Sequence, residues 1–146
     1  MTTLAEFEGL AAADHGLCVV VTTRADGSAQ ASVVNAGVTQ HPVTHEPVVA
    51  LVARGTTRKL ANLRARPRMT IVARNGWQWA AVEGTTKIIG PDDPGDFSAD
   101  AIRVLLREVF IAAGGTHDDW DEYDRVMLED RRAAVFVTPE RVYSNG

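Results

Sequence analysis

Hydroxyl and cationic side chains gather over one short stretch of the chain, Arg54-Gly55-Thr56-Thr57-Arg58-Lys59. An apolar run at residues 48–53 precedes the stretch and predicts a buried strand, whereas Leu60 and Leu63 follow it with the spacing of one helical face. The first N–H groups of a helix have no partner within the helix, and the macrodipole favours an anion beside them. A phosphate therefore suits the N-terminus of the helix predicted from Thr57 to Arg66.

The same residues allow a purely structural interpretation. Thr56 or Thr57 can serve as an N-cap, and the basic side chains can form a solvated face, which comprises Arg58, Lys59, Arg64 and Arg66. Cations in the first turn oppose the helix dipole, however, and capping alone favours acidic residues there. Two adjacent cations at this end are easier to explain if an anion binds.

Length and composition restrict the classes of protein. The 146 residues suit one domain, predicted to span 1–146, and the 45% of apolar residues predict a folded chain with a core. The net charge of -4 argues against general nucleic-acid binding. No apolar run is long enough for a membrane span, and the N-terminus lacks signal-peptide features. We therefore expect a cytoplasmic protein with no membrane or nucleic-acid partner.

Strands joined by hairpin signals dominate the pattern. The predicted strands are 17–23, 30–38, 48–53, 69–73 and 77–89, followed by 133–137 and 141–143 as one strand or as two separated at Pro139; the predicted helices are 2–13, 57–66, 98–113 and 119–130. Asp26-Gly27 and Asn75-Gly76 are turn signals. Because regular βαβ alternation is missing, we expect a mainly β fold with some α, either a barrel or a sandwich. No dinucleotide or Walker motif is present.

Three segments together resemble a known family. They are Ala31-Ser32-Val33-Val34-Asn35-Ala36, Thr57-Arg58-Lys59-x-x-Asn62-Leu63-x-x-x-Pro67 and Trp77-Gln78-Trp79-Ala80-Ala81-Val82-Glu83-Gly84. The pattern resembles the pyridoxamine 5′-phosphate oxidase-like split-barrel family, and more specifically its actinobacterial branch, which uses the deazaflavin coenzyme F-420. The resemblance runs from about residue 17 to residue 89, with a weaker match over 135–143.

The resemblance implies a six-stranded antiparallel split β-barrel with short peripheral helices, assembled as a homodimer with the cofactor groove at the interface. It implies three groups of cofactor-binding residues: Val33, Val34, Asn35 and Ala36 along the ring; Arg54, Thr56, Thr57, Arg58, Lys59 and Asn62 around the phosphate; and Trp79 with Gln78 reaching in from the second subunit. Trp77 and Trp79 are expected to form a wall of the ring pocket, and the alternative for both is packing within the barrel and the dimer interface. For Asn62 the alternative is a bracing role in the turn.

Several cofactors occur in this family, including FMN and, in one branch, heme. The chain lacks the arginine and histidine motif of true pyridoxamine phosphate oxidases, so vitamin B6 oxidation is not expected. The compact length and the Arg58-Lys59-x-x-Asn62-Leu63 pattern resemble the deazaflavin branch and favour coenzyme F-420 over FMN. The expected function is hydride transfer from reduced F-420 to an electron-poor small molecule of the enone, lactone or quinone type. The alternatives are an FMN-dependent oxidoreductase and a non-catalytic F-420 carrier.

No catalytic acid and no metal site stand out in the sequence. His41 and His45 have an H-x-x-x-H spacing, but they fall in a proline-containing loop rather than on a helix. His15 and His117 are expected at the surface. Cys18 lies in an apolar run without a disulfide partner, which predicts a buried core thiol.

Overall fold

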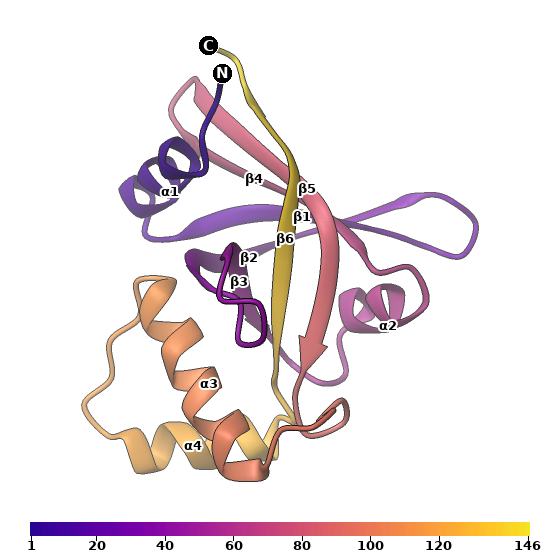
Figure 1. Ribbon diagram of the computed structural model, residues 1–146, viewed down its shortest axis with the longest axis vertical. Coiled ribbons are helices and arrows are strands. Elements are labelled where there is room, and N and C mark those ends of the chain that lie inside the picture. The colour runs from indigo at the N-terminus through magenta and orange to yellow at the C-terminus, as the bar shows by residue number, and fades with distance from the viewer.

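Six antiparallel strands close into a barrel in the order β1-β2-β3-β6-β5-β4 in the computed structural model, which describes all residues from Met1 to Gly146 (Figure 1). The strands are β1 (Leu17–Thr23), β2 (Ala29–Gln40), β3 (Pro47–Ala53), β4 (Arg68–Asn75), β5 (Gln78–Ile89) and β6 (Ala133–Ser144); the helices are α1 (Leu4–Ala13), α2 (Arg58–Ala65), α3 (Ala99–Ala112) and α4 (Trp120–Glu129). The predicted six-stranded antiparallel barrel with peripheral helices is confirmed.

Alternating burial along the strands fills the barrel. In β1, Cys18 and Val20 point inward, while Leu17 and Val19 point outward. Burial raises the pKa of the Cys18 thiol to about 12, as expected for a core cysteine. Helix α1 adds Phe7 to the same core, and a reciprocal Thr3–Glu6 capping box begins this helix.

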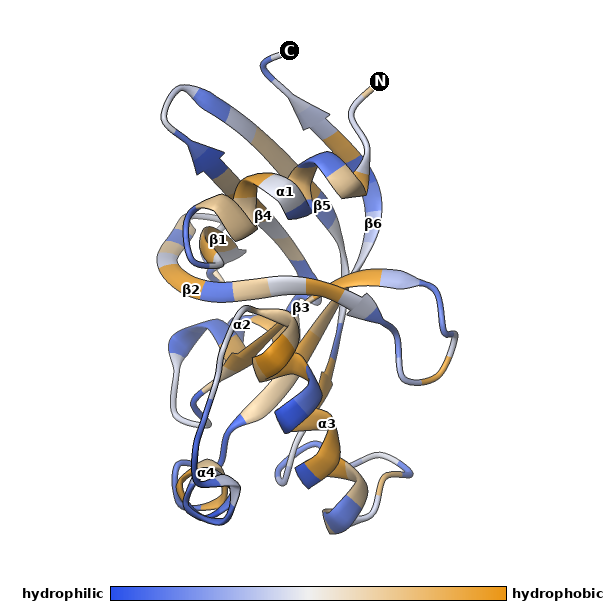
Figure 2. Cartoon of the chain, turned by 90° about the vertical axis from the view of Figure 1, so that its left-hand side faces the viewer, coloured by the Kyte–Doolittle hydropathy of each residue, from blue (hydrophilic) through white to orange (hydrophobic).

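Helices α3 and α4 form an insertion between β5 and β6 and lie beside the barrel (Figures 1 and 2). The apolar side of α3 packs outside the barrel against β3 and β6, where it forms a second core with Val48, Ala50 and Phe136. The insertion leaves and re-enters the barrel at neighbouring positions, because Ile89 pairs with Ala134. The two helices therefore extend from one corner of an otherwise continuous sheet.

The end of α3 packs directly on the backbone of the barrel. A Cβ on Gly37 would lie 1.9 Å from the carbonyl oxygen of Ala112, and one on Gly16 would lie 2.2 Å from that of Ala113. Only residues without a side chain permit this approach. The two glycines thus determine how closely α3 packs on the start of β1 and the middle of β2.

Some element boundaries differ from the predicted ones. Strand β6 runs without a break through Pro139, because a register shift opposite Glu83 and Gly84 accommodates the residue that lacks an N–H group. Trp77 lies in the two-residue turn between β4 and β5 rather than in a strand. Thr57 is the residue that precedes α2, not its first helical residue. None of the four helices combines the length and the apolar character that crossing a bilayer requires.

The contact between β2 and α3 can be tested by replacing Gly37 with alanine. Because the new methyl group would overlap backbone atoms, we expect Gly37→Ala to lower the free energy of unfolding by about 1–3 kcal/mol or more. The measurement is urea denaturation. Gly9→Ala is the matched control, since no atom lies within 4 Å of its added Cβ and alanine favours a helix. Equal denaturation midpoints for the two variants would contradict the close packing.

Candidate functional site

A cavity of about 710 Å³ lies between the barrel and the α3–α4 insertion. This volume falls within the range of small-molecule sites in proteins. The walls come from β2, from the loop between β3 and α2, from both helices of the insertion and from the start of β6; they include His15, Val33, Val34, Asn35, Val52, Ala53, Arg54, Thr57, Lys59, Val109, Phe110, Ala113, Gly114, Gly115, His117, Glu122, Tyr123, Val126, Met127 and Arg132.

The N-terminus of α2, where Thr57 and Lys59 line one end of this cavity, has unpaired backbone donors. Thr57 precedes the helix, but its side chain accepts no hydrogen bond from the first turn. Its Oγ1 instead donates to the carbonyl oxygen of Arg54 at 2.9 Å. The N–H groups of Arg58, Lys59 and Leu60 consequently have no acceptor within the protein. The capping interpretation therefore does not account for the threonine.

Positive charge exceeds negative charge at the same end. Arg54 and Arg132 share one carboxylate, because both guanidinium groups form ion pairs with Asp130, at 3.8 and 3.1 Å. Lys59 is half-buried and has no ion-pair partner. Burial lowers the pKa of Lys59, and the nearby charge of Arg132 lowers it further. An anion in the cavity would relieve both effects.

A close backbone approach holds these cations together. Gly55 donates its N–H to the carbonyl oxygen of Asp130 at 3.1 Å. A Cβ on Gly55 would lie 2.6 Å from the carbonyl oxygen of Arg131, so glycine is required at this position. The loop that leads into α2 is thereby fixed against the segment between α4 and β6.

Six of the residues predicted from the sequence line this one cavity: Val33, Val34 and Asn35 from β2, and Arg54, Thr57 and Lys59 from the region of α2. The Asn35 side chain also donates to the carbonyl oxygen of His15 at 2.9 Å, which ties β2 to the start of β1. Thr56 and Arg58 are exposed beside the cavity and do not line it.

Two other predicted residues lie in the barrel itself. Ala36 is buried in the core and pairs with Leu51. Asn62 is also buried, and its amide donates to Thr22 Oγ1 at 3.1 Å. Thr22 in turn donates to the side chain of Gln30 at 3.1 Å. Of the two roles predicted for Asn62, the contacts correspond to bracing, since this chain fastens α2 to β1 and β2.

The hairpin segment Trp77-Gln78-Trp79 lies outside the cavity. Trp77 is 94% exposed, and the two tryptophans border an apolar hollow with Val72 and Tyr143. Gln78 lines a shallow depression near α1. Within one chain, this segment and the cavity are separate.

Sequence reasoning missed the contribution of the α3–α4 insertion. His117, Glu122 and Arg132 line the cavity, although His117 was expected at the surface. These residues lie far along the chain from β2, and the packing of α3 on Gly37 helps to bring the insertion near it. The Gly114-Gly115 pair between the two helices was the available signal of a close turn.

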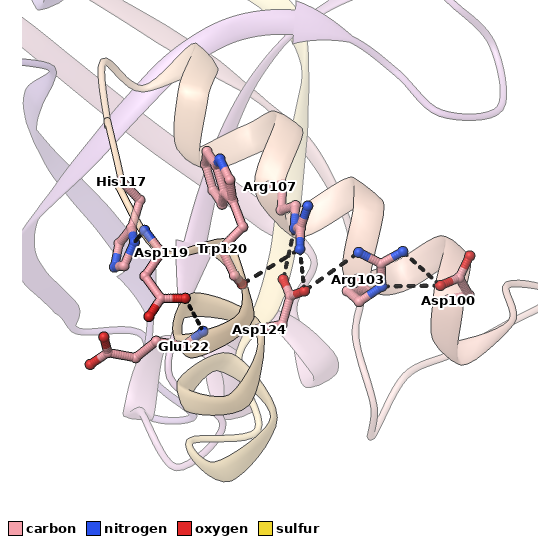
Figure 3. Close-up of polar contacts among 8 residues, drawn as sticks. All are labelled: Asp100, Arg103, Arg107, His117, Asp119, Trp120, Glu122 and Asp124. Carbon is pink, nitrogen blue, oxygen red and sulfur yellow. Dashed lines mark hydrogen bonds and ion pairs between the residues drawn. The ribbon is translucent and has the colours of Figure 1, made fainter.

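Ion pairs connect the two helices of the insertion (Figure 3). Arg107 and Arg103 of α3 form ion pairs with Asp124 of α4. Behind them, Phe110 and Tyr123 pack with ring centroids 4.9 Å apart. The Tyr123 hydroxyl donates to the carbonyl oxygen of Leu106 at 3.0 Å, and burial raises its pKa to about 12, so it remains a protonated structural donor.

Comparison with known proteins identifies the fold. No family model matches the sequence. The conserved hypothetical protein Rv2991 from Mycobacterium tuberculosis superposes with a TM-score of 0.68 at 17% identity, over 99% of this chain and 84% of that one. An F-420 reductase gives a TM-score of 0.58 at 14% identity, over 87% of this chain and 88% of that one.

A pyridoxamine 5′-phosphate oxidase-related, FMN-binding protein from Nostoc punctiforme PCC 73102 gives a TM-score of 0.60 at 12% identity, over 98% of this chain and 86% of that one. The chain has the split-barrel fold of the pyridoxamine 5′-phosphate oxidase-like proteins. At these identities the similarity is one of fold, so the ligand must be argued from the cavity of this split barrel.

The uncompensated charge of Lys59 generates a prediction for the ligand-free protein. Because its pKa is lowered on folding, the protonated side chain destabilises the folded state in full below that lowered pKa, and this penalty shrinks as the pH rises from there toward the ordinary pKa of lysine. We expect Lys59→Met to raise the free energy of unfolding at neutral pH, with the gain shrinking at alkaline pH.

Chemical denaturation at several pH values measures this effect. Lys87→Met is the matched control, because Lys87 is exposed and lies outside the cavity, so its change should stay within about 0.5 kcal/mol. If Lys59→Met instead lowered the free energy of unfolding, the ammonium group would have favourable partners in the ligand-free protein, and the prediction would be wrong.

Proposed function

We propose that this split barrel binds coenzyme F-420 in the cavity and transfers a hydride from its reduced form to an electron-poor small molecule. The observation that carries the proposal is the position of Lys59, in the uncapped first turn of α2, at one end of a cavity that β2 lines at the other end. The fold shared with an F-420 reductase supports the same cofactor.

The α2 end suits the cofactor phosphate. Lys59 and Arg54 offer charge-assisted hydrogen bonds, and the amides of the first turn offer neutral ones. Arg58 is exposed at the same helix end without an ion pair and adds positive charge at the entrance. Binding a phosphate here replaces the missing cap and compensates the charge of Lys59.

The β2 end suits the ring. Val33 and Val34 present apolar surface, and Val109 and Phe110 face the same cavity from α3. When bound, reduced F-420 supplies a hydride from its ring, and the protein's task is to hold the acceptor beside it and to limit water. The α3–α4 wall serves both purposes.

A homodimer completes the proposal. Strand pairing places Val33, Val19, Val72, Ala81 and Tyr143 side by side across β2, β1, β4, β5 and β6; we call this row the outer apolar face. Val33 is 65% exposed and Val19 is 41% exposed. Because Val33 also lines the cavity, a second copy seated on this face would border the cofactor. The exposed Trp77 and the half-buried Trp79 would then reach the partner's cavity.

FMN is the second candidate, since a protein of the same fold is described as FMN-binding and both cofactors carry a phosphate. We expect F-420 to bind more tightly than FMN when the two are compared by calorimetric titration. Heme is titrated in the same way as a third ligand. Micromolar binding of FMN or heme without binding of F-420 would overturn the choice of cofactor.

The phosphate site has its own test. Replacing both Arg58 and Lys59 with alanine removes two cations, each of which typically contributes about 1.5–3 kcal/mol to a charge-assisted hydrogen bond. We therefore expect F-420 affinity to fall by roughly 10²-fold or more. A phosphate-free fragment of the cofactor should lose much less affinity. Unchanged F-420 affinity in the folded double variant would show that the cofactor phosphate does not bind at the N-terminus of α2.

The dimer can be tested at the centre of the outer apolar face. We expect Val19→Glu to convert a dimer to a monomer in light scattering and to weaken F-420 binding, because a buried unpaired carboxylate is costly. Val43→Glu is the control, since Val43 is 60% exposed on the loop between β2 and β3. A monomeric parent protein at micromolar concentration would contradict the proposed assembly.

A further inference from the structure

The imidazole of His117 lies on the cavity wall, and it takes part in none of the proposed contacts with the cofactor. It belongs to the loop between α3 and α4, and its side chain is 28% exposed. The loop enters through Gly115, where an added Cβ would lie 2.3 Å from the ring of Phe110. The loop therefore lies directly on the aromatic wall, with little freedom to move.

The hydrogen bonding of the imidazole determines its tautomer. Its Nδ1 accepts the backbone N–H of Asp119 at 2.9 Å (Figure 3). In the neutral ring the proton is therefore on Nε2, because one nitrogen accepts and the other donates. Nε2 has no hydrogen-bond partner in the protein. The result is an N–H donor whose direction is fixed by the backbone.

Neighbouring rings hold this donor in place. His117 packs against Trp120 and Tyr123, with ring centroids 5.9 and 5.8 Å apart. Trp120 is covered by the guanidinium of Arg107, 5.2 Å from its ring centroid, and Arg107 is anchored by Asp124. The donor is thus preorganised before any ligand arrives, which is the condition under which a hydrogen bond assists catalysis most.

Glu122 restricts the charge of the molecule that this donor meets. Its side chain lines the same cavity and makes no hydrogen bond or ion pair (Figure 3). A free carboxylate in the same cavity disfavours an anionic acceptor. A neutral molecule with an acceptor oxygen fits both groups.

We propose that the Nε2–H of His117 binds the carbonyl oxygen of the hydride acceptor, a neutral enone or quinone. The inference rests on the proposed function and names the acceptor class. For an enone, the hydride and its two electrons from reduced F-420 form a new C–H bond at the β-carbon. The π electrons of the C=C bond form a new double bond to the carbonyl carbon, and the π electrons of the C=O bond move to oxygen. His117 stabilises this oxyanion, water supplies the proton that completes the product, and the cofactor leaves oxidised.

The matched variants are His117→Asn and His117→Gln. The Oδ1 of asparagine can accept the Asp119 N–H in place of Nδ1, so His117→Asn keeps the loop contact and loses the Nε2 donor. Glutamine keeps a donor at the reach of Nε2. With reduced F-420 and the quinone menadione, we expect kcat/KM to fall by about 10²-fold in His117→Asn and by much less in His117→Gln. F-420 affinity and the unfolding midpoint should stay at the parental values in both.

A second measurement does not depend on turnover. In the cofactor-free protein, added menadione should shift the imidazole Nε2 resonance of His117 in ¹⁵N NMR spectra. Parental kcat/KM in folded His117→Asn would overturn the inference and leave cofactor binding intact. If the parent protein binds no F-420, the proposed function fails, and the resonance decides the inference: a menadione-dependent shift supports the donor, and an unchanged signal overturns it.

Discussion

The contact between the backbone of β2 and the end of α3 is the constraint on which the site depends. Gly37 and Gly16 leave no room for a side chain against Ala112 and Ala113, so the insertion cannot shift along the barrel without breaking this packing. The contact sets the width of the cavity and the position of Phe110 at its edge. Ion pairs between α3 and α4 then fix the position of α4 and of the loop that holds His117.

The arrangement of charges at the α2 end of the cavity is not optimal for stability. A single carboxylate, Asp130, serves two arginines, while Lys59 is half-buried beside them without a partner. A fold selected only for stability would cap α2 and pair this lysine. Functional sites commonly retain such unfavourable groups, because a bound molecule supplies the missing interactions. The uncharged backbone N–H groups of Arg58 and Leu60 likewise have no hydrogen-bond acceptor within the protein.

The sequence predicted the barrel well because its strands carry local signals, namely β-branched alternation and glycine turns that need no distant information. The grouping of Arg54, Thr57 and Lys59 at one end of the cavity was also predictable, since strand, loop and helix follow one another directly there. The insertion wall was not, because the neighbours of His117 in space are set by packing between Gly37 and Ala112, far apart in the chain. Asn62 shows the converse limit: a motif position can be occupied by a residue whose hydrogen bond to Thr22 is structural.

The way in which the insertion joins the barrel has an evolutionary consequence. Its two ends meet at the paired residues Ile89 and Ala134, so residues 90–133 form a closed excursion whose length hardly affects the strand pairing. The segment can therefore be exchanged as a cassette, provided that its first helix still ends in bare backbone contact with Gly37. Such an exchange would alter the cavity wall formed by α3 and α4, while the α2 end would stay unchanged only if Asp130 and Arg132 were kept. One barrel can in this way be diversified toward many small molecules through a single replaceable module.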